Sequence, residues 1–126
     1  MGRNVIAWFE MPIRRLSEVK AFYENVFGFN IVEKCVDGRT FGTIQIRTPN
    51  GIDSCGVLAE YPEPLPCSSI QYFQASTKLQ FDDILSKVPK NGGVIITMPP
   101  RNHPILNSEF AICEDNKKNK FGVIIN

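Results

Sequence analysis

Residues 4–28 read NVIAWFEMPIRRLSEVKAFYENVFG, and this stretch decides the fold. Its first part, Asn4–Met11, is short and mostly apolar, which is typical of a buried strand. Pro12 is predicted to end this strand, because proline has no backbone N–H to donate to a ladder. Over Leu16–Val26 the apolar residues recur at helical spacing, and Gly28 follows as a helix stop. We therefore expect a strand followed by an amphipathic helix.

Three further strand patterns follow this helix. Asn30–Val36 and Thr40–Arg47 both alternate apolar and polar residues, and Asp37-Gly38 between them is a strong hairpin signal. Pro49–Gly51 predicts another turn, and Ser54–Ala59 a fourth strand. The first half of the chain is therefore predicted as strand, helix and three strands.

The second half repeats this order after a proline-rich segment. Residues 60–67 contain Pro62, Pro64 and Pro66, and such a segment is extended, so it is predicted to be a linker. The helix of the second half is expected to start at a Thr77-x-x-Gln80 capping box. Its strands are predicted at Ser69–Ala75, Val94–Met98, Glu109–Glu114 and Phe121–Ile125, with Arg101–Asn107 as a loop.

The repeated order predicts an α+β fold made of two βαβββ modules in one chain. The division is module one over residues 1–59, a linker over 60–67 and module two over 68–126, all within a single domain of residues 1–126. A module with a curved sheet buries only one sheet face. The two modules are therefore expected to pair into a curved mixed sheet that encloses a cleft.

Composition excludes several classes of function. The chain has 126 residues and a formal net charge of +1 without a basic block, so nucleic-acid binding has no electrostatic support. No apolar run approaches the ~20 residues of a membrane helix. None of the four cysteines forms a C-x-x-C pair, so they are interpreted as small hydrophobic residues, with disulfides or a zinc site as the alternatives. A cytoplasmic location is the resulting expectation.

Several segments together resemble a known family. Trp8–Ile13 and Phe22–Phe29 are similar to the strand-and-helix opening of the glyoxalase and bleomycin-resistance family, whose fold is called vicinal-oxygen-chelate. Gly92–Ile95, Phe110–Ile112 and Asp115–Asn119 resemble its double glycine, penultimate strand and final turn. Two positions depart from the family pattern: Arg15 stands where an acid is common, and Lys118 replaces a glycine in the final turn.

The resemblance also bears on a metal site. Metal-binding members take His, Gln or Glu ligands from the first and last strand of each half. Trp8 falls at the first histidine position, and aligning Leu16 with Leu79 makes Gln71 its counterpart. The last strands align so that Gly56 and Gly122 stand at the acid positions. Of these four residues only Gln71 can bind a metal, since Trp8 has no lone pair to offer and glycine has no side chain. Glu10, two residues from Trp8, would share the strand face of Trp8 and adds a single acid.

The resemblance therefore implies a metal-free small-molecule-binding protein that works as a homodimer and has no cofactor. One alternative is a divergent lyase, isomerase or dioxygenase that uses either a divalent metal or metal-free acid–base catalysis by Glu10 or His103. The other alternative is a non-catalytic regulatory module. Without a functional role, Glu10 would be a solvated or hydrogen-bonded acid and His103 a surface histidine. The candidate cleft residues are Trp8, Glu10, Gly56, Gln71, Phe73, His103 and Gly122.

Overall fold

The computed structural model describes residues 9–61 and 70–125. The first half forms a four-stranded sheet with one helix, which we call module one. Its elements are β1 (Phe9–Ile13), α1 (Leu16–Phe27), β2 (Asn30–Val36), β3 (Arg39–Thr48) and β4 (Gly51–Glu60). The strand order is β1-β4-β3-β2, in which β1 runs parallel to β4 and the other pairs are antiparallel.

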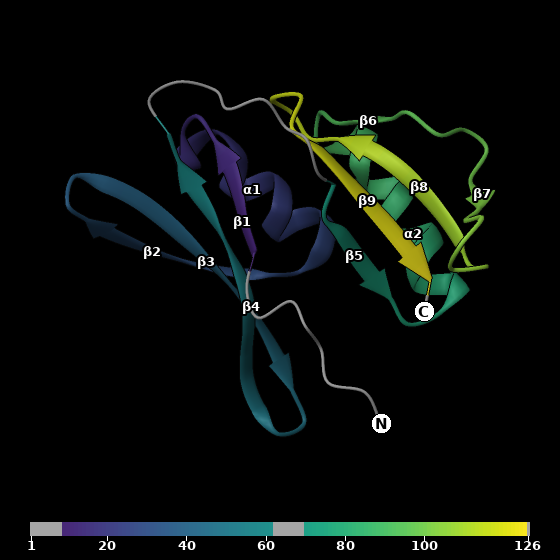
Figure 1. Ribbon diagram of the computed structural model, residues 1–126, viewed down its shortest axis with the longest axis horizontal. Coiled ribbons are helices and arrows are strands. Elements are labelled where there is room, and N and C mark those ends of the chain that lie inside the picture. The colour runs from purple at the N-terminus through teal and green to yellow at the C-terminus, as the bar shows by residue number, and fades with distance from the viewer. Residues whose placement is uncertain (1–8, 62–69, 126) are drawn as a thin grey trace.

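The second half, module two, forms its own mixed sheet. Its elements are β5 (Tyr72–Ala75), α2 (Lys78–Lys90), β6 (Val94–Ile95), β7 (Arg101–Asn102), β8 (Glu109–Glu114) and β9 (Lys120–Ile125). The strand order is β5-β9-β8-β6, β7 also pairs with β8, and β5 runs parallel to β9. The predicted α+β class with two βαβββ modules is confirmed, in the form of two mixed sheets that lie side by side (Figure 1).

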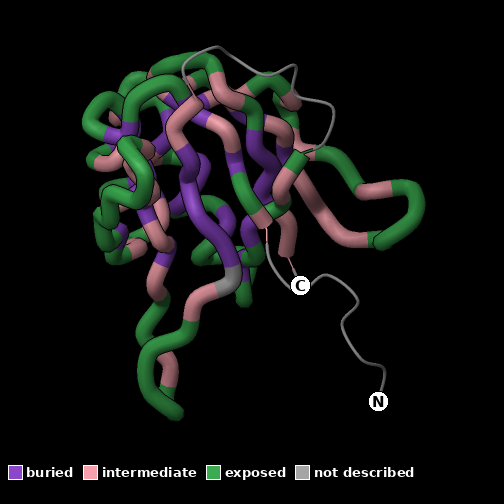
Figure 2. Tube along the Cα trace, turned by 60° about the vertical axis from the view of Figure 1, so that its left-hand side comes forward, coloured by how far each residue is buried: buried purple, intermediate pink, exposed green. Residues whose placement is uncertain are grey.

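The two modules share one hydrophobic core on the helix side of the sheets. The helix faces are buried as their periodicity predicts, and α1 contacts both α2 and the strands of its own sheet. Aromatic rings extend this packing across the modules. The ring centre of Phe27 in α1 lies 4.7 Å from that of Phe73 in β5 and 5.6 Å from that of Phe121 in β9. Figure 2 shows buried positions gathered inside the molecule and exposed ones at the hairpin ends.

A buried polar contact ties the modules together. The Tyr23 hydroxyl of α1 donates to Asp115 Oδ2 at 2.8 Å, and Asp115 follows β8 in module two. The same carboxylate accepts from the backbone N–H groups of Lys117 and Asn119 and from the Asn119 amide. Burial and then the Asp115 charge raise the pKa of Tyr23 well above its ordinary value, so this hydroxyl remains a donor.

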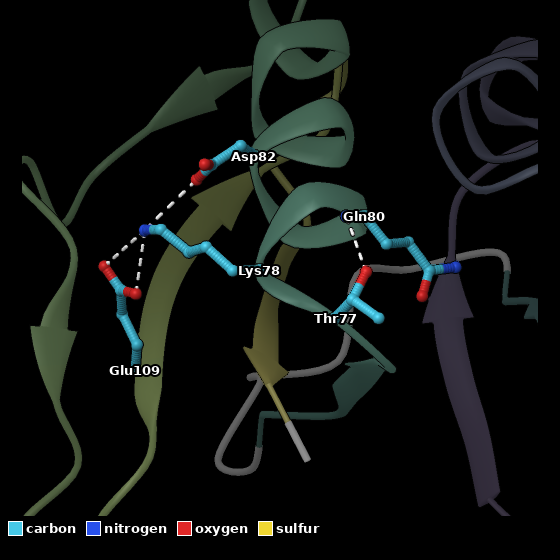
Figure 3. Close-up of polar contacts among 5 residues, drawn as sticks. All are labelled: Thr77, Lys78, Gln80, Asp82 and Glu109. Carbon is cyan, nitrogen blue, oxygen red and sulfur yellow. Dashed lines mark hydrogen bonds and ion pairs between the residues drawn. The ribbon is translucent and has the colours of Figure 1, made fainter.

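The start of α2 follows the predicted capping pattern with one change. Thr77 Oγ1 accepts from the Gln80 N–H at 3.1 Å (Figure 3). The Gln80 side chain accepts from the Ser76 N–H rather than from that of Thr77. On the other side of the first turn, Lys78 joins Asp82 and Glu109, which links α2 to β8.

Several predicted strand limits were wrong, and β4 and β5 start at Gly51 and Tyr72. β1 continues through Pro12 to Ile13, because β1 is the edge strand of its sheet and an edge tolerates the missing N–H of proline. β6 ends at Ile95 instead of Met98, since the next two N–H groups, Ile96 and Thr97, both donate to the Ile112 carbonyl and interrupt the ladder. The short strand β7 forms within the predicted loop.

The linker prediction falls mainly outside the described residues. Glu60 is the last residue of β4, and Tyr61 continues the pairing by donating its N–H to the Ile13 carbonyl at 3.0 Å. Residues 62–67 of the predicted linker are not among those that the structure describes. No helix within 9–61 and 70–125 is long and apolar enough to cross a membrane.

Candidate functional site

Each sheet has one face toward the helices and one that the helices leave uncovered, here called its open face. In β1, Met11 and Ile13 belong to the core, whereas Glu10 is exposed on the other side. In β5, Phe73 and Ala75 are buried and Tyr72 is exposed. Strand alternation therefore places Glu10 on the open face of module one and Tyr72 on that of module two.

A polar and aromatic group of side chains occupies the open face of module one. We call Glu10, Arg39, Phe41 and Tyr61 the Arg39 cluster. The Tyr61 hydroxyl donates to Glu10 Oε2 at 3.1 Å. The guanidinium carbon of Arg39 lies 4.4 Å from the ring centre of Tyr61 and 4.9 Å from that of Phe41, within cation–π range of both.

The backbone explains why these residues meet. Arg39 opens β3 directly after the tight Asp37-Gly38 turn, where both φ angles are positive. The register then sets Phe41 opposite Ala59 of β4, and Tyr61 follows two residues later. Sequence reasoning missed Arg39 and Tyr61 as site residues, because only the pairing of β1, β3 and β4 brings them to Glu10.

The Arg39 guanidinium has unused capacity for hydrogen bonding. Its Nε donates to the Glu60 carbonyl at 3.3 Å, while its Nη2 is buried and has no partner within the described part of the chain. Glu60 uses its own carboxylate elsewhere, accepting from the Leu16 N–H at 2.7 Å at the start of α1. The planar Arg39 guanidinium and the Glu10 carboxylate thus both contact Tyr61, the first at its ring and the second at its hydroxyl.

The open face of module two carries an aromatic group. The rings of Tyr72, His103 and Phe110 lie 5.1 to 6.2 Å apart. His103 Nδ1 accepts from the Ile105 and Leu106 N–H groups at 3.2 and 3.1 Å, which assigns the neutral-ring proton to Nε2. The Nδ1 atom of His103 is therefore used within the loop that follows it, and only Nε2 is left for another partner.

The structure does not bring the predicted site residues to one place. Gly56 lies on the side of β4 where Phe9 packs, and a Cβ there would be 2.3 Å from that ring. Phe73 belongs to the core, and the Gln71 carbonyl accepts from the Gly122 N–H at 2.8 Å just before β5. Glu10 is in the Arg39 cluster, Gly122 and His103 adjoin Tyr72, and Trp8 lies outside the described residues.

The predicted alignment of Leu16 with Leu79 between the two modules was wrong by one residue. The buried positions of α1 and α2 correspond as Val19 with Phe81, Phe22 with Ile84 and Val26 with Val88, which pairs Leu16 with Lys78. Leu79 is 82% exposed and faces away from the core. Lys78 and Leu79 were both possible partners of Leu16 in the alignment. The sequence favours Leu79 because it is apolar, and only the packing of α2 shows that Lys78 is the partner.

With Leu16 paired to Lys78, the counterpart of Trp8 becomes Ile70 instead of Gln71. On the open faces Glu10 pairs with Val57 in module one, and Tyr72 pairs with Gly122 in module two. This set offers one carboxylate and one phenol. Within the described residues no three His, Cys, Asp or Glu side chains gather closely enough to hold a metal ion. Among the described residues, one carboxylate and one phenol do not make up the several converging nitrogen or oxygen ligands that a divalent cation takes.

Comparisons with known proteins agree with the fold. The family model described as Glyoxalase/Bleomycin resistance protein/Dioxygenase superfamily matches residues 5–123. A search of the curated proteins gave no match.

Solved structures resemble the chain over nearly its whole length. A glyoxalase/bleomycin resistance protein/dioxygenase family enzyme from Burkholderia phytofirmans has a TM-score of 0.69 and 18% identity, with 95% of this chain and 97% of that chain covered. A glyoxylase/bleomycin resistance protein/dioxygenase domain from Frankia has a TM-score of 0.75 and 15% identity, with 99% of each chain covered. A lactoylglutathione lyase from Agrobacterium tumefaciens has a TM-score of 0.62 and 16% identity, with 100% of this chain and 96% of that chain covered.

Proposed function

Because the chain belongs to the glyoxalase/bleomycin resistance protein/dioxygenase superfamily, we propose that it binds a small organic molecule on the open face of module one, through the Arg39 cluster and without a metal ion. The observation that carries this proposal is the Arg39 guanidinium. It is held between two aromatic rings and has a buried, unpartnered Nη2 among the described residues. The two rings hold the guanidinium in place, so a ligand acceptor would receive a charge-assisted hydrogen bond from a group that is already fixed.

The cluster indicates the chemistry of the ligand. Arg39 would donate to a carbonyl or carboxylate oxygen, and Glu10 would accept from a ligand N–H, O–H or cationic group. The rings of Phe41 and Tyr61 provide apolar surface on either side of the guanidinium. We therefore expect a planar molecule that carries an acceptor and a donor or positive group.

Binding without a metal is supported by the donor set. Val57, Tyr72 and Gly122 stand with Glu10 at the paired open-face positions, and neither Val57 nor Gly122 has a donor side chain. If a divalent-metal lyase or dioxygenase were the correct alternative, purified protein would hold stoichiometric nickel, zinc, iron or manganese. We expect elemental analysis to find less than about one-tenth of an equivalent, and ligand binding to survive EDTA. Stoichiometric metal would overturn this part of the proposal.

Ligand binding can be tested with a matched pair of variants. A thermal-shift screen of planar carboxylates, amides and cationic aromatic compounds should identify ligands, and quenching of Trp8, the sole tryptophan, provides a second signal. For such a ligand, Arg39→Met should weaken binding at least about tenfold, since a hydrogen bond to a charged group is lost. Arg47→Met changes the same residue type on the same strand, outside the cluster, and should bind as the parent does.

The Arg39 comparison also sets the condition for rejecting the site. Equal binding by the Arg39→Met and Arg47→Met proteins would show that the ligand lies elsewhere. A screen without any shift would favour the regulatory-module alternative instead. Glu10→Gln, with Glu114→Gln of β8 as its control, should alter binding only of ligands that carry a donor or positive charge.

We also propose that the protein acts as a homodimer. The open face of module two has exposed aromatic and aliphatic side chains, among them Tyr72, and a loop beside it exposes Ile105 and Leu106. Such apolar surface is typical of an interface. A second copy that covers it would remove these apolar side chains from water.

A further inference from the structure

A pocket of about 700 Å³ lies where the two modules meet, apart from the Arg39 cluster except for Tyr61. One wall is the end of β1 and the start of α1, and the other is the turn between β8 and β9. Its volume is within the range of small-molecule sites. Because its walls come from both modules, an occupant would touch module one and module two at once.

The charge of this pocket differs sharply from that of the whole chain. Five basic residues and one acid line it: Arg14, Arg15, Lys117, Lys118, Lys120 and Glu18. The full sequence has 14 basic and 13 acidic residues, so the remainder of the chain is net acidic. Cations that gather in a concave site focus a positive potential there and attract anions.

Most of these cations are unpaired. Lys117 is 3.6 Å from Glu18, and this is the one ion pair among the charged residues of the pocket wall within the described chain. Arg14, Arg15, Lys118 and Lys120 have neither an ion pair nor a side-chain hydrogen bond in the part of the chain that the structure describes. Lys118 even adopts a φ of 68°, a left-handed conformation that is strained for a side-chain-bearing residue.

The floor of the pocket is different in character. The apolar residues of its lining, here called the apolar base, are Met11, Pro12, Ile13, Val19 and Tyr61. A bare inorganic ion would use the cations and leave this base unused. A ligand with an apolar part as well as negative charge would use both.

We propose that this junction pocket binds a small organic anion with at least two negative charges, of the phosphate-ester class. The anionic group lies among Arg14, Arg15, Lys118 and Lys120, and the apolar part lies over the base of the pocket. Arginine and lysine both bind phosphate, and charge-assisted hydrogen bonds are about twice as strong as neutral ones. The enclosed shape favours a small molecule over an extended nucleic-acid strand, which needs a continuous basic track.

Calorimetric titration in a phosphate-free buffer tests the proposal. The probes are phenyl phosphate, inorganic pyrophosphate and, as the neutral analogue, phenol. We expect both anions to bind and phenol not to bind, with affinity falling as salt rises from about 50 to about 500 mM because exposed charges are screened. Phenyl phosphate should also raise the melting temperature, because it contacts both modules.

Two double variants with the same change in net charge separate the pocket from the general surface. Arg14→Gln with Lys120→Gln should weaken phenyl phosphate binding at least about tenfold. Lys34→Gln with Lys90→Gln, in β2 and at the end of α2, removes two exposed cations outside the pocket and should leave the affinity unchanged. Circular dichroism would check that both variants are folded.

Three outcomes would overturn the proposal. One is the absence of binding by either anion at low salt, and another is an equal loss of affinity in the two double variants. The third is binding of a single-stranded oligonucleotide with no binding of phenyl phosphate, which would make this face a nucleic-acid surface. The pocket shares only Tyr61 with the Arg39 cluster and Arg39 does not line it, so Arg39→Met should retain phenyl phosphate binding whether or not the proposed function is correct.

Discussion

At the scale of single residues, the contact between Tyr23 and Asp115 joins the modules within the core. Tyr23→Phe removes one of the hydrogen bonds to a buried carboxylate and leaves its backbone and Asn119 donors in place. We expect the free energy of unfolding to fall by about 1–3 kcal/mol, as for a hydrogen bond to a charged group. Urea unfolding measures this loss. Tyr61→Phe, which removes an exposed hydroxyl contact, should cost less than about 0.5 kcal/mol.

The same tyrosine predicts how stability depends on alkaline pH. Its pKa in the folded state lies above the ordinary value of 10.0, so its contribution is complete below pH 10 and is lost as the pH rises through the folded pKa. Burial likewise raises the pKa of the Cys113 thiol from 9.0 to about 12, which predicts a loss that starts near pH 9. The parent should therefore lose more stability above pH 10 than Tyr23→Phe does. Parallel curves for the two proteins would contradict this assignment.

At the scale of elements, the cap of α2 provides a direct test of a sequence signal. Thr77→Ala removes the oxygen that accepts from the Gln80 N–H and should destabilise the protein by about 1 kcal/mol. Thr77→Ser keeps a hydroxyl at the same position and should lose only a few tenths. Thermal unfolding of the three proteins measures both effects. An alanine variant as stable as the serine variant would show that the Ser76–Gln80 contact suffices alone.

The same elements show what sequence patterns can and cannot predict. Both helices were predicted from their apolar spacing, and the β2–β3 hairpin from Asp37-Gly38, because these signals lie within a few neighbouring residues. The end of β6 was not predictable, since it depends on two N–H groups sharing the distant Ile112 carbonyl. Leu79 misled the alignment because an exposed leucine and a buried one look alike in sequence.

The candidate site was predictable only in part for a similar reason. Glu10 was identified from its place near the first strand, but its partners come from the start of β3 and from the residue after β4. Arg39 and Tyr61 meet only because β1 pairs with β4 and β4 with β3. Local patterns predict each strand, whereas the neighbours of an open-face residue depend on strand order and register.

At the scale of the whole molecule, exposed apolar side chains of module two predict self-association. Ile105 is 83% exposed and Met98 71% exposed, on the two segments that flank β7. Isolated exposed apolar residues are ordinary, but several on neighbouring segments next to an uncovered sheet face are typical of an interface. The homodimer proposal therefore places a second copy against this side of module two.

The prediction is a dimer that charge can dissociate. Light scattering coupled to size exclusion should give a mass of about twice 14.2 kDa for the parent. Met98→Lys with Ile105→Lys should shift the protein to monomer, because two ammonium groups would have to be desolvated in the interface. Leu79→Lys introduces one lysine at an equally exposed apolar position on α2, the helix side of the sheet, and should leave the dimer intact. A monomeric parent would contradict the homodimer, and the Arg39 cluster would then bind its ligand within one chain. Dissociation by Leu79→Lys instead would place the interface on the helix side of the molecule.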